Sequence, residues 1–399
     1  MFRTIMPTAG TPYRLEDIGR AILGAFEDKN IIEQYKNSLK SYLNVDNLLL
    51  VNSGTTACFI LLQLFKHHRK NREQNEVIIP DYTAPSLLLP IRQAGLDAVV
   101  VDTDPQTFNI DISKIEKHIS NKTLAIMPVH MFGIPTRIQP ILEIAKKYNI
   151  FVFEDAASSL GSQINGKHTG AVAPFGFYSM NRGKNISTLS GGIITWKDTQ
   201  YSPKLQKLCN NLPELSTTGK LLILLKIIGL GLAVRPPFYT LLYAIISRYK
   251  YTDLHTDFRS FQYTTLQAAE GKNIWKRAKY LTQKRIENGQ KLYSIFQDQK
   301  GLQVADPPNN TEIAFNQFPI LFQNLEHRAE FRSKLLNKGI ETSLMYGKAL
   351  HQIYPNLDST GQYSNAEYLA QHLLLIPPHP QINDTFLSQI KDTIENLTR

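Results

Sequence analysis

Cysteines and long apolar runs are scarce in this sequence, and each scarcity excludes a class of protein. Cys58 and Cys209 are the only cysteines among 399 residues. Two cysteines cannot build a disulfide framework in so long a chain, which favours a reducing compartment. Residues 1–7 lack the apolar run of a signal peptide. These absences predict a cytoplasmic protein.

Motifs for metals and nucleic acids are also missing. No cysteines and histidines have the spacing of a zinc site, so no metal site is predicted. No RNA- or DNA-binding signature occurs, so no nucleic acid partner is predicted. Positive charge is in excess, with a formal net charge of +10. This excess suits an anionic partner such as a phosphorylated metabolite or an acidic membrane surface, or it is only a solvated basic surface.

Short apolar runs alternate with amphipathic stretches between residues 45 and 200. This alternation predicts an α/β fold with a mostly parallel central sheet and helices on both faces. The predicted strands are Asn47–Val51, Glu76–Pro80, Asp97–Asp102, Thr123–Val129, Ile150–Glu154, Gly176–Ser179 and Gly192–Trp196. The predicted helices are Thr56–His67, Ser86–Gln93, Ile112–Ile119 and Ile138–Lys147.

The pattern changes after residue 257. We expect a large domain at 1–257 and a smaller C-terminal α+β domain at 258–399, because a chain of this length can divide in two. The second part has predicted helices at Thr265–Phe296, His327–Lys338 and Asp384–Leu397, and predicted strands at Ile313–Phe322 and Ile340–Met345.

An apolar insert at about 200–257 interrupts this organisation. Its two apolar runs, Leu221–Val234 and Phe238–Ile246, are each shorter than the roughly 20 residues of a spanning helix, and a proline pair separates them. Two interpretations stay open. One is a helical hairpin buried against the body of the protein or a second subunit. The other is a peripheral membrane contact through 221–250, which would suit the cations that flank the runs. These cations are Lys220, Lys226, Arg235, Arg248 and Lys250.

Three motifs, taken in order, describe a pocket for an anionic aromatic aldehyde. Asn52–Ala57 joins a strand to an apolar helix, where backbone N–H groups and the helix dipole favour a phosphate. Asp155 ends an apolar strand, where a carboxylate can keep a pyridine nitrogen protonated. Lys184 lies in a turn between strands, where desolvation can free its amine to attack an aldehyde. Singly, each motif is also explained by a helix cap or a surface lysine.

Together, the motifs resemble the DegT/StrS family of pyridoxal-phosphate-dependent sugar aminotransferases. Further runs at ordered positions carry the same resemblance over nearly the whole chain, except for residues 200–257. These runs are Ile78-Ile79-Pro80, Pro128-Val129-His130-Met131-Phe132-Gly133, Leu266-Gln267-Ala268-Ala269, Leu350-His351 and Ile376-Pro377-Pro378-His379-Pro380. The resemblance implies a fold-type-I, aspartate-aminotransferase-like homodimer whose active sites lie at the subunit boundary.

The resemblance also assigns roles to single residues. Lys184 would form a Schiff base with pyridoxal 5'-phosphate and then carry a proton, and Asp155 would pair with the ring nitrogen. Thr55, Thr56 and Ser179 would bind the phosphate. The tentative substrate contacts are His130, Tyr346 and His351.

The chain departs from the family pattern at several contacts. Ser158 stands where members commonly have glutamine, so it would be a weaker contact to the cofactor ring. Ala84 stands where many members have an aromatic that stacks on the ring, and Tyr82 is a candidate substitute. Ser260 and Gln262 replace the asparagine and arginine of a phosphate-binding motif, with Arg259 adjacent.

The reaction implied is transfer of an amino group, usually from glutamate, to a keto group on a nucleotide-linked sugar. A lysine at position 184 argues against the dehydratase branch, where histidine replaces it. Three alternatives stay open: a substrate carried on a lipid, a pseudo-enzyme that acts as a regulator or scaffold, and a pyridoxal-phosphate lyase or epimerase, because fold alone does not fix the reaction.

Overall fold

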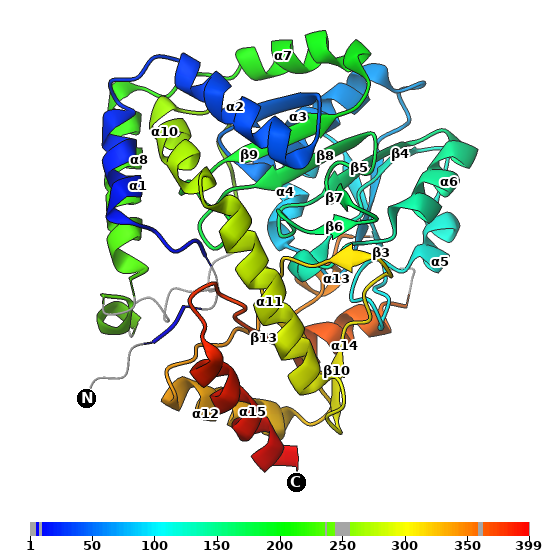
Figure 1. Ribbon diagram of the computed structural model, residues 1–399. Coiled ribbons are helices and arrows are strands. Elements are labelled where there is room, and N and C mark those ends of the chain that lie inside the picture. Colours follow the sequence, from blue (N-terminus) through cyan, green and yellow to red (C-terminus); the bar gives the residue numbers. More distant parts are fainter. Residues whose placement is uncertain (1–4, 8–9, 236–237, 244–255, 358–361, 399) are drawn as a thin grey trace.

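The computed structural model describes residues 5–7, 10–235, 238–243, 256–357 and 362–398 (Figure 1). A seven-stranded sheet forms its centre, in the order β1-β9-β8-β5-β4-β2-β3. Only β9 runs antiparallel to its neighbours, and the other pairs in this sheet are parallel. The strands are β1 (Asn47–Val51), β2 (Glu76–Pro80), β3 (Asp97–Val101), β4 (Thr123–Ile126), β5 (Phe151–Asp155), β8 (Phe175–Ser179) and β9 (Gly192–Trp196).

The mostly parallel α/β sheet is therefore confirmed. Its helices cover both faces, because successive side chains of a strand point to opposite sides. In β9, Ile193 packs in one buried cluster with Tyr35 of α2, whereas Ile194 packs in another with Phe65 of α3. The helices of this part are α1 (Leu15–Leu23), α2 (Asn30–Leu43), α3 (Gly54–His68), α4 (Leu88–Gln93), α5 (Ile112–Ile115), α6 (Ile138–Tyr148) and α7 (Ser202–Asn210).

A second, three-stranded antiparallel sheet lies in the C-terminal part, in the order β10-β12-β13. Its strands are β10 (Leu302–Val304), β12 (Phe318–Phe322) and β13 (Leu373–Ile376), and the accompanying helices are α12 (Leu325–Asn337), α13 (Leu350–Ile353), α14 (Ser364–His372) and α15 (Asp384–Thr398). Phe318 belongs to the same buried cluster as Phe65 and Phe153 of the first part. One core thus spans both parts, and the boundary at 257/258 stays a prediction.

Three C-terminal predictions differ from the structure. The predicted helix Thr265–Phe296 is two helices, α10 (Thr265–Trp275) and α11 (Ala278–Phe296), separated where Arg277 leaves helical geometry. The predicted strand Ile313–Phe322 is too long, because only its second half, β12 at Phe318–Phe322, is a strand. Just before the predicted range, a short strand β11 (Thr311–Glu312) pairs with β6 (Gln163–Ile164), which pairs in turn with β7 (Lys167–His168). Predicted strand Ile340–Met345 makes only isolated bridges, at Ile340 and Ser343.

The apolar insert begins with α8 (Thr217–Ala233), which lies beside α1 at the edge of the molecule (Figure 1). No helix among the described residues is long and apolar enough to cross a membrane. The second apolar run, predicted at Phe238–Ile246, is helical over residues 238–243, and residues 244–246 lie outside the described residues, as do Arg248 and Lys250.

Candidate functional site

Three parallel strands bring the predicted site residues to one edge of the sheet. β1, β5 and β8 end at Val51, Asp155 and Ser179, and α3 begins at Gly54. The carboxyl ends of parallel strands share an edge, which is where ligands bind in open α/β sheets. A Cβ atom added to Gly54 would lie 2.9 Å from the Cβ of Ser179. The helix start and the serine are therefore in direct contact.

Lys184 lies in the loop that joins β8 to β9. Gly183, with φ +85°, allows the chain to turn before the lysine. The Lys184 amine donates a hydrogen bond to Ser158 Oγ at 2.9 Å. Asn185 fixes the next position by donating to the carbonyl oxygens of Leu160 and Ala314, at 3.1 and 2.7 Å. The amine is thus turned toward the segment that follows Asp155, within a partly buried setting.

Burial and charge perturb both groups. Burial lowers the pKa of Lys184, and the negative charge of Asp155 partly opposes this shift. Burial raises the pKa of Asp155, while the Ala157 N–H, which donates to its carboxylate at 2.8 Å, and the charges of Lys184 and His130 oppose it. The two groups therefore lie within electrostatic reach of each other. A lowered pKa increases the fraction of neutral, nucleophilic amine at neutral pH.

The start of α3 bears on one predicted contact, that of the Thr56 N–H with a phosphate. Ser53 is the N-cap, and its side-chain oxygen accepts a hydrogen bond from the Thr56 N–H at 3.0 Å. The Thr56 N–H is therefore already paired, which does not fit its predicted bond to a phosphate. The N–H groups of Gly54 and Thr55 precede it in the first helical turn, where backbone donors have no intrahelical acceptor. Thr56 instead donates its hydroxyl to Ser260 Oγ at 3.2 Å.

The segment that replaces the family's phosphate-binding motif lies against this helix start within the same chain. Asn52 donates its side-chain amide to the carbonyl oxygen of Arg259 at 2.8 Å and accepts from the Phe261 N–H at 2.9 Å. Gln262 bridges to Val51. Arg259 is exposed, and its predicted role as the substitute charge stays a prediction.

His130 does not fit the predicted contact with substrate. One ring nitrogen lies 2.9 Å from Glu154, and the other accepts the Thr136 N–H at 2.9 Å. Both His130 and Glu154 have no exposed surface. Glu154 also accepts hydrogen bonds from the N–H groups of Val172 and Ala173, at 2.8 and 2.6 Å. This geometry supports a positioning role, in which His130 fixes the residues beside Asp155.

His351 is likewise held by protein groups. Its ring nitrogens lie 2.6 Å from Asp81 and 3.0 Å from Glu367, and its ring stacks on Tyr363. Burial alone would lower the pKa of His351, but hydrogen bonds and charges from the two carboxylates raise it overall. Each ring nitrogen is thus paired with a carboxylate, and the imidazole ties α13 to the end of β2. The predicted substrate contact of His351 stays a prediction.

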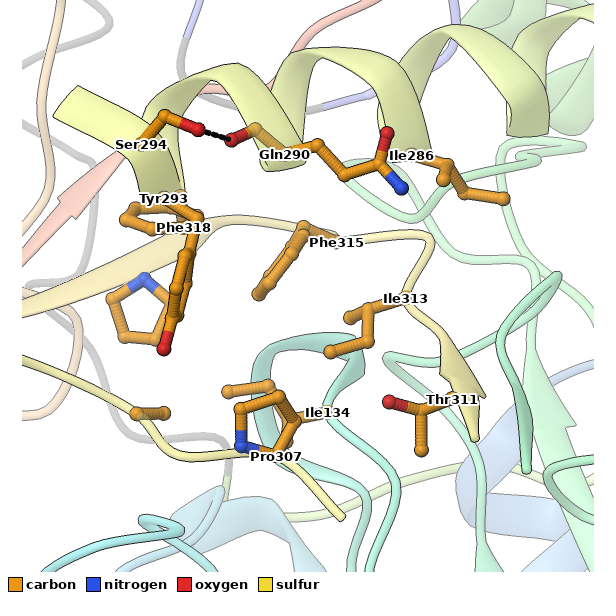
Figure 2. A pocket seen from close by; sticks show the side chains of 13 residues that line it. Ile134, Ile286, Gln290, Tyr293, Ser294, Pro307, Thr311, Ile313, Phe315 and Phe318 are labelled. Carbon is orange, nitrogen blue, oxygen red and sulfur yellow. Dashed lines mark hydrogen bonds between the residues drawn. The ribbon is translucent and has the colours of Figure 1, made fainter. Parts of the chain in front are cut away.

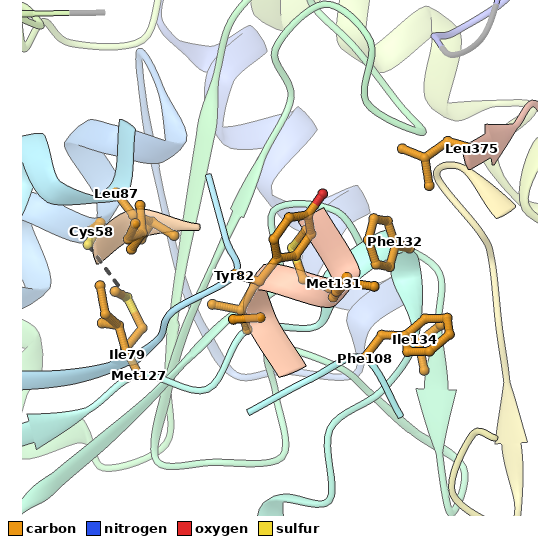
Figure 3. Packing of buried hydrophobic residues seen from close by; sticks show 14 of the residues in the cluster. Cys58, Ile79, Tyr82, Leu87, Phe108, Met127, Met131, Phe132, Ile134 and Leu375 are labelled. Atoms are coloured by element: carbon orange, nitrogen blue, oxygen red, sulfur yellow. Dashed lines mark hydrogen bonds between the residues drawn. The ribbon is translucent and has the colours of Figure 1, made fainter. Parts of the chain in front are cut away.

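Tyr82 is packed in the core, and Figure 3 shows its ring near Phe132. It is 1% exposed and donates to the carbonyl oxygen of Tyr346 at 3.2 Å. Whether Tyr82 replaces the aromatic residue that stacks on the cofactor ring stays a prediction. Tyr346 is partly buried, and its substrate contact also stays a prediction. Ala84 is also partly buried, at the start of a short helical turn.

A separate apolar pocket of about 310 Å³ lies between α11 and the segment before β12. Figure 2 shows Tyr293 and Ile286 of α11 on one side and Phe315 and Ile313 on the other. Lys184 and Asp155 do not line it. The chemistry proposed below therefore does not use this pocket.

The residues that fix the lysine loop from a distance could not be found from the sequence. Thr11 accepts the Ser187 N–H at 2.8 Å and donates to the carbonyl oxygen of Asn185 at 3.2 Å. Tyr13 donates to the carbonyl oxygen of Ser187 at 3.0 Å. These contacts join positions more than 170 residues apart, so no local pattern announces them. By contrast, Glu154 adjoins Asp155 in the sequence, and its position at the end of a buried strand was a usable signal.

Comparison with known proteins agrees with this geometry. The sequence model of the DegT/DnrJ/EryC1/StrS aminotransferase family matches residues 21–220 and 248–395. The chain belongs to this family. Residues 221–247, which contain most of α8, fall between the two matched stretches.

Two curated relatives and one solved structure illustrate the similarity. GDP-perosamine synthase of Caulobacter vibrioides is 34% identical over 177 residues, which are 44% of this chain and 47% of that protein, about half the length of each. GDP-4-keto-6-deoxy-D-mannose 3-dehydratase of Yersinia pseudotuberculosis is 26% identical over 87% of this chain and 86% of that protein. The sugar aminotransferase CalS13 of Micromonospora echinospora has the same fold, with a TM-score of 0.78 at 20% identity over 98% and 99% of the two chains.

Proposed function

We propose that this chain is a pyridoxal-phosphate-dependent aminotransferase that moves an amino group from glutamate to a keto group on a nucleotide-linked sugar. The observation that carries the proposal is the Lys184 amine. Burial lowers its pKa, Ser158 holds it at 2.9 Å, and the Asp155 carboxylate lies within electrostatic reach. Family membership and the names of the relatives support the reaction and the class of substrate.

The donor set at the sheet edge fits the cofactor. Pyridoxal phosphate has an aldehyde, a ring nitrogen and a phosphate, and it supplies an electron sink for bonds at an amino-acid α-carbon. Lys184 would attach the aldehyde, and Asp155 would pair with the ring nitrogen. The phosphate would meet the N–H groups of Gly54 and Thr55 at the positive end of α3, with the Ser179 hydroxyl beside them. In this assignment each part of the cofactor meets protein groups of complementary chemistry.

The residues of the site have two roles, which are attachment of the cofactor and proton transfer. A neutral Lys184 amine can accept a proton at Nζ and return it, because its lowered pKa brings its acid–base equilibrium closer to neutral pH. Ser158 keeps the amine directed toward the segment that follows Asp155. His130 and Glu154 act through position only, as both are fully buried behind Asp155.

An absorption experiment tests the proposal. The purified protein is saturated with pyridoxal phosphate, and its spectrum is recorded before and after glutamate. We expect conversion to the pyridoxamine form, followed by reversal with a keto-sugar nucleotide. A protein that binds cofactor but never converts would support the pseudo-enzyme alternative, and release of water or inversion of the sugar without amination would support a dehydratase, lyase or epimerase.

Lys197 provides a matched control for Lys184. Burial lowers the pKa of both lysines. Lys197 follows β9, which runs opposite to the parallel strands, so it lies at the other edge of the sheet. Lys184→Ala should abolish conversion and covalent attachment, whereas Lys197→Ala should leave both intact. Equal losses in the two variants would contradict the assignment of Lys184.

A homodimer with active sites at the subunit boundary belongs to the same proposal. The family resemblance supports it, and the exposed Arg259 beside the start of α3 is the residue we expect near that boundary. Analytical ultracentrifugation at micromolar concentration tests it directly. A protein that stays monomeric while fully active would contradict the dimer.

A further inference from the structure

The outer face of α8 is a stripe of exposed leucines. Leu221, Leu222, Leu225 and Leu232 are 56%, 52%, 56% and 39% exposed. At 3.6 residues per turn, these four positions fall within about a third of the helix circumference. We call this surface the α8 stripe. A helix in water normally turns such a face toward a core, so its exposure indicates that something apolar covers it.

The inner face of the same helix is already occupied. Ile227 and Gly231 are its buried residues, and a Cβ atom added to Gly231 would lie 2.8 Å from Ile18 of α1. Figure 1 shows α1 and α8 side by side at the edge of the molecule, apart from the central sheet. The fold therefore uses one side of α8 for packing and presents the other to the surroundings.

The stripe lies outside the stretches that match the family model. All four leucines fall in the interval 221–247, between the two stretches that match the family. Exposed apolar residues also continue beyond the helix, with Phe238 at 50% and Leu241 at 76%.

Charge identifies the occupant. Between Glu214 and Asp253 the sequence has five cations and no carboxylate. Lys220 and Lys226 are exposed on α8 itself. Leucines combined with lysines on one short helix are typical of a helix that lies in the plane of an anionic membrane surface. Because α8 has 17 residues, fewer than the roughly 20 that a spanning helix needs, a peripheral position is the one that fits.

We propose that the α8 stripe inserts into the headgroup region of a bilayer that contains anionic lipid, with Lys226, at the edge of the stripe, contacting lipid phosphates. The docked surface is close to the site through α1. Thr11 and Tyr13, just before α1, bond the loop that carries Lys184. Docking on α8 thus holds the lysine loop near the lipid surface. The proposal does not depend on which keto-sugar is the substrate.

Vesicle flotation tests the proposal on the full chain. The probes are vesicles of phosphatidylcholine alone and of phosphatidylcholine mixed with phosphatidylglycerol, at low and high salt. The protein should float with the anionic vesicles, and high salt should weaken binding. The triple variant Leu221→Ser/Leu225→Ser/Leu232→Ser should lower partitioning by about tenfold or more, because binding scales with buried apolar area.

Matched surface variants separate a specific stripe from general stickiness. Leu325 and Tyr280 are 42% and 56% exposed outside the insert, so Leu325→Ser/Tyr280→Ser should not change flotation. Lys226→Gln should weaken binding to anionic vesicles only, and the same change at an exposed lysine elsewhere, Lys279→Gln, should not. Circular dichroism and the thermal midpoint verify that each variant is folded.

Two results would overturn the proposal. One is a protein that stays with the soluble fraction in the presence of anionic vesicles, or a triple variant that floats as well as the parent. The other is an assembly of the parent that the triple variant dissociates while neither binds vesicles, which would assign the stripe to a second copy of the chain. Conversion of the cofactor by glutamate without vesicles is scored separately, and its loss would count against the proposed function rather than against docking.

Discussion

The hydroxyl of Ser158 makes a sharp prediction about the acidity of Lys184. The amine donates to this oxygen at 2.9 Å, and no other side-chain acceptor for it is found in the described part of the chain. A hydrogen bond to a charged group contributes about 1.5–3 kcal/mol. We take the lower limit because the site is partly open and water replaces some of the loss. One pKa unit corresponds to about 1.4 kcal/mol, so Ser158→Ala should lower the pKa of Lys184 by about one unit.

The rate of covalent attachment of pyridoxal phosphate to the cofactor-free protein measures this pKa, because the neutral amine is the reactive form. Below the pKa of both proteins, Ser158→Ala should attach the cofactor about tenfold faster at equal saturation, with the whole pH profile displaced toward acid. Ser158→Thr retains a hydroxyl and should restore the parent profile. Superimposable profiles for Ser158→Ala and the parent would refute the claim that this contact sets the acidity of the lysine.

Two further predictions concern buried charge. Burial raises the pKa of Glu270 well above its usual value, so folding favours the neutral form of this acid. The stabilising contribution of this preference is complete below the unfolded-state pKa of about 4.3. It is lost as the pH rises toward the pKa of the folded state. Glu270→Gln should therefore raise the thermal midpoint more at pH 8 than at pH 5, and an equal shift at both would contradict this. Arg277 pairs with the fully buried Asp17 at 2.6 Å, and Arg277→Met should lower the free energy of unfolding by about 3–5 kcal/mol; urea denaturation measures this, and a loss below about 1 kcal/mol would argue against it.

Much of the central sheet could be predicted from local pattern. The structure has β1, β2 and β9 at the predicted bounds, because each is a short apolar run with polar or small residues beside it. The family, confirmed by its sequence model, was evident from the ordered motifs around Asp155 and Lys184. The local sequence is therefore enough to predict these strands and the order of the site residues along the chain.

Tertiary contacts determine the features that the local sequence pattern does not predict. Helical periodicity continues through Arg277, but its guanidinium reaches Asp17 at the point where α10 and α11 separate. His130 occupies a family motif, yet both its nitrogens are bonded to protein partners that the sequence does not reveal. Thr56 has the residue type expected beside a phosphate, but the Ser53 cap pairs its N–H first. The sequence could not predict these hydrogen-bond and ion-pair partners, because they are distant in the chain or depend on the local geometry.

Location of the cofactor on the chain is the most direct test of the central claim. The protein is saturated with pyridoxal phosphate, the covalent bond is fixed by borohydride reduction, and the modified peptide is identified by mass spectrometry. We expect a single modified residue, Lys184, and no modification after prior conversion by glutamate. Stable modification at another lysine with Lys184 untouched, or no modification at all, would contradict it.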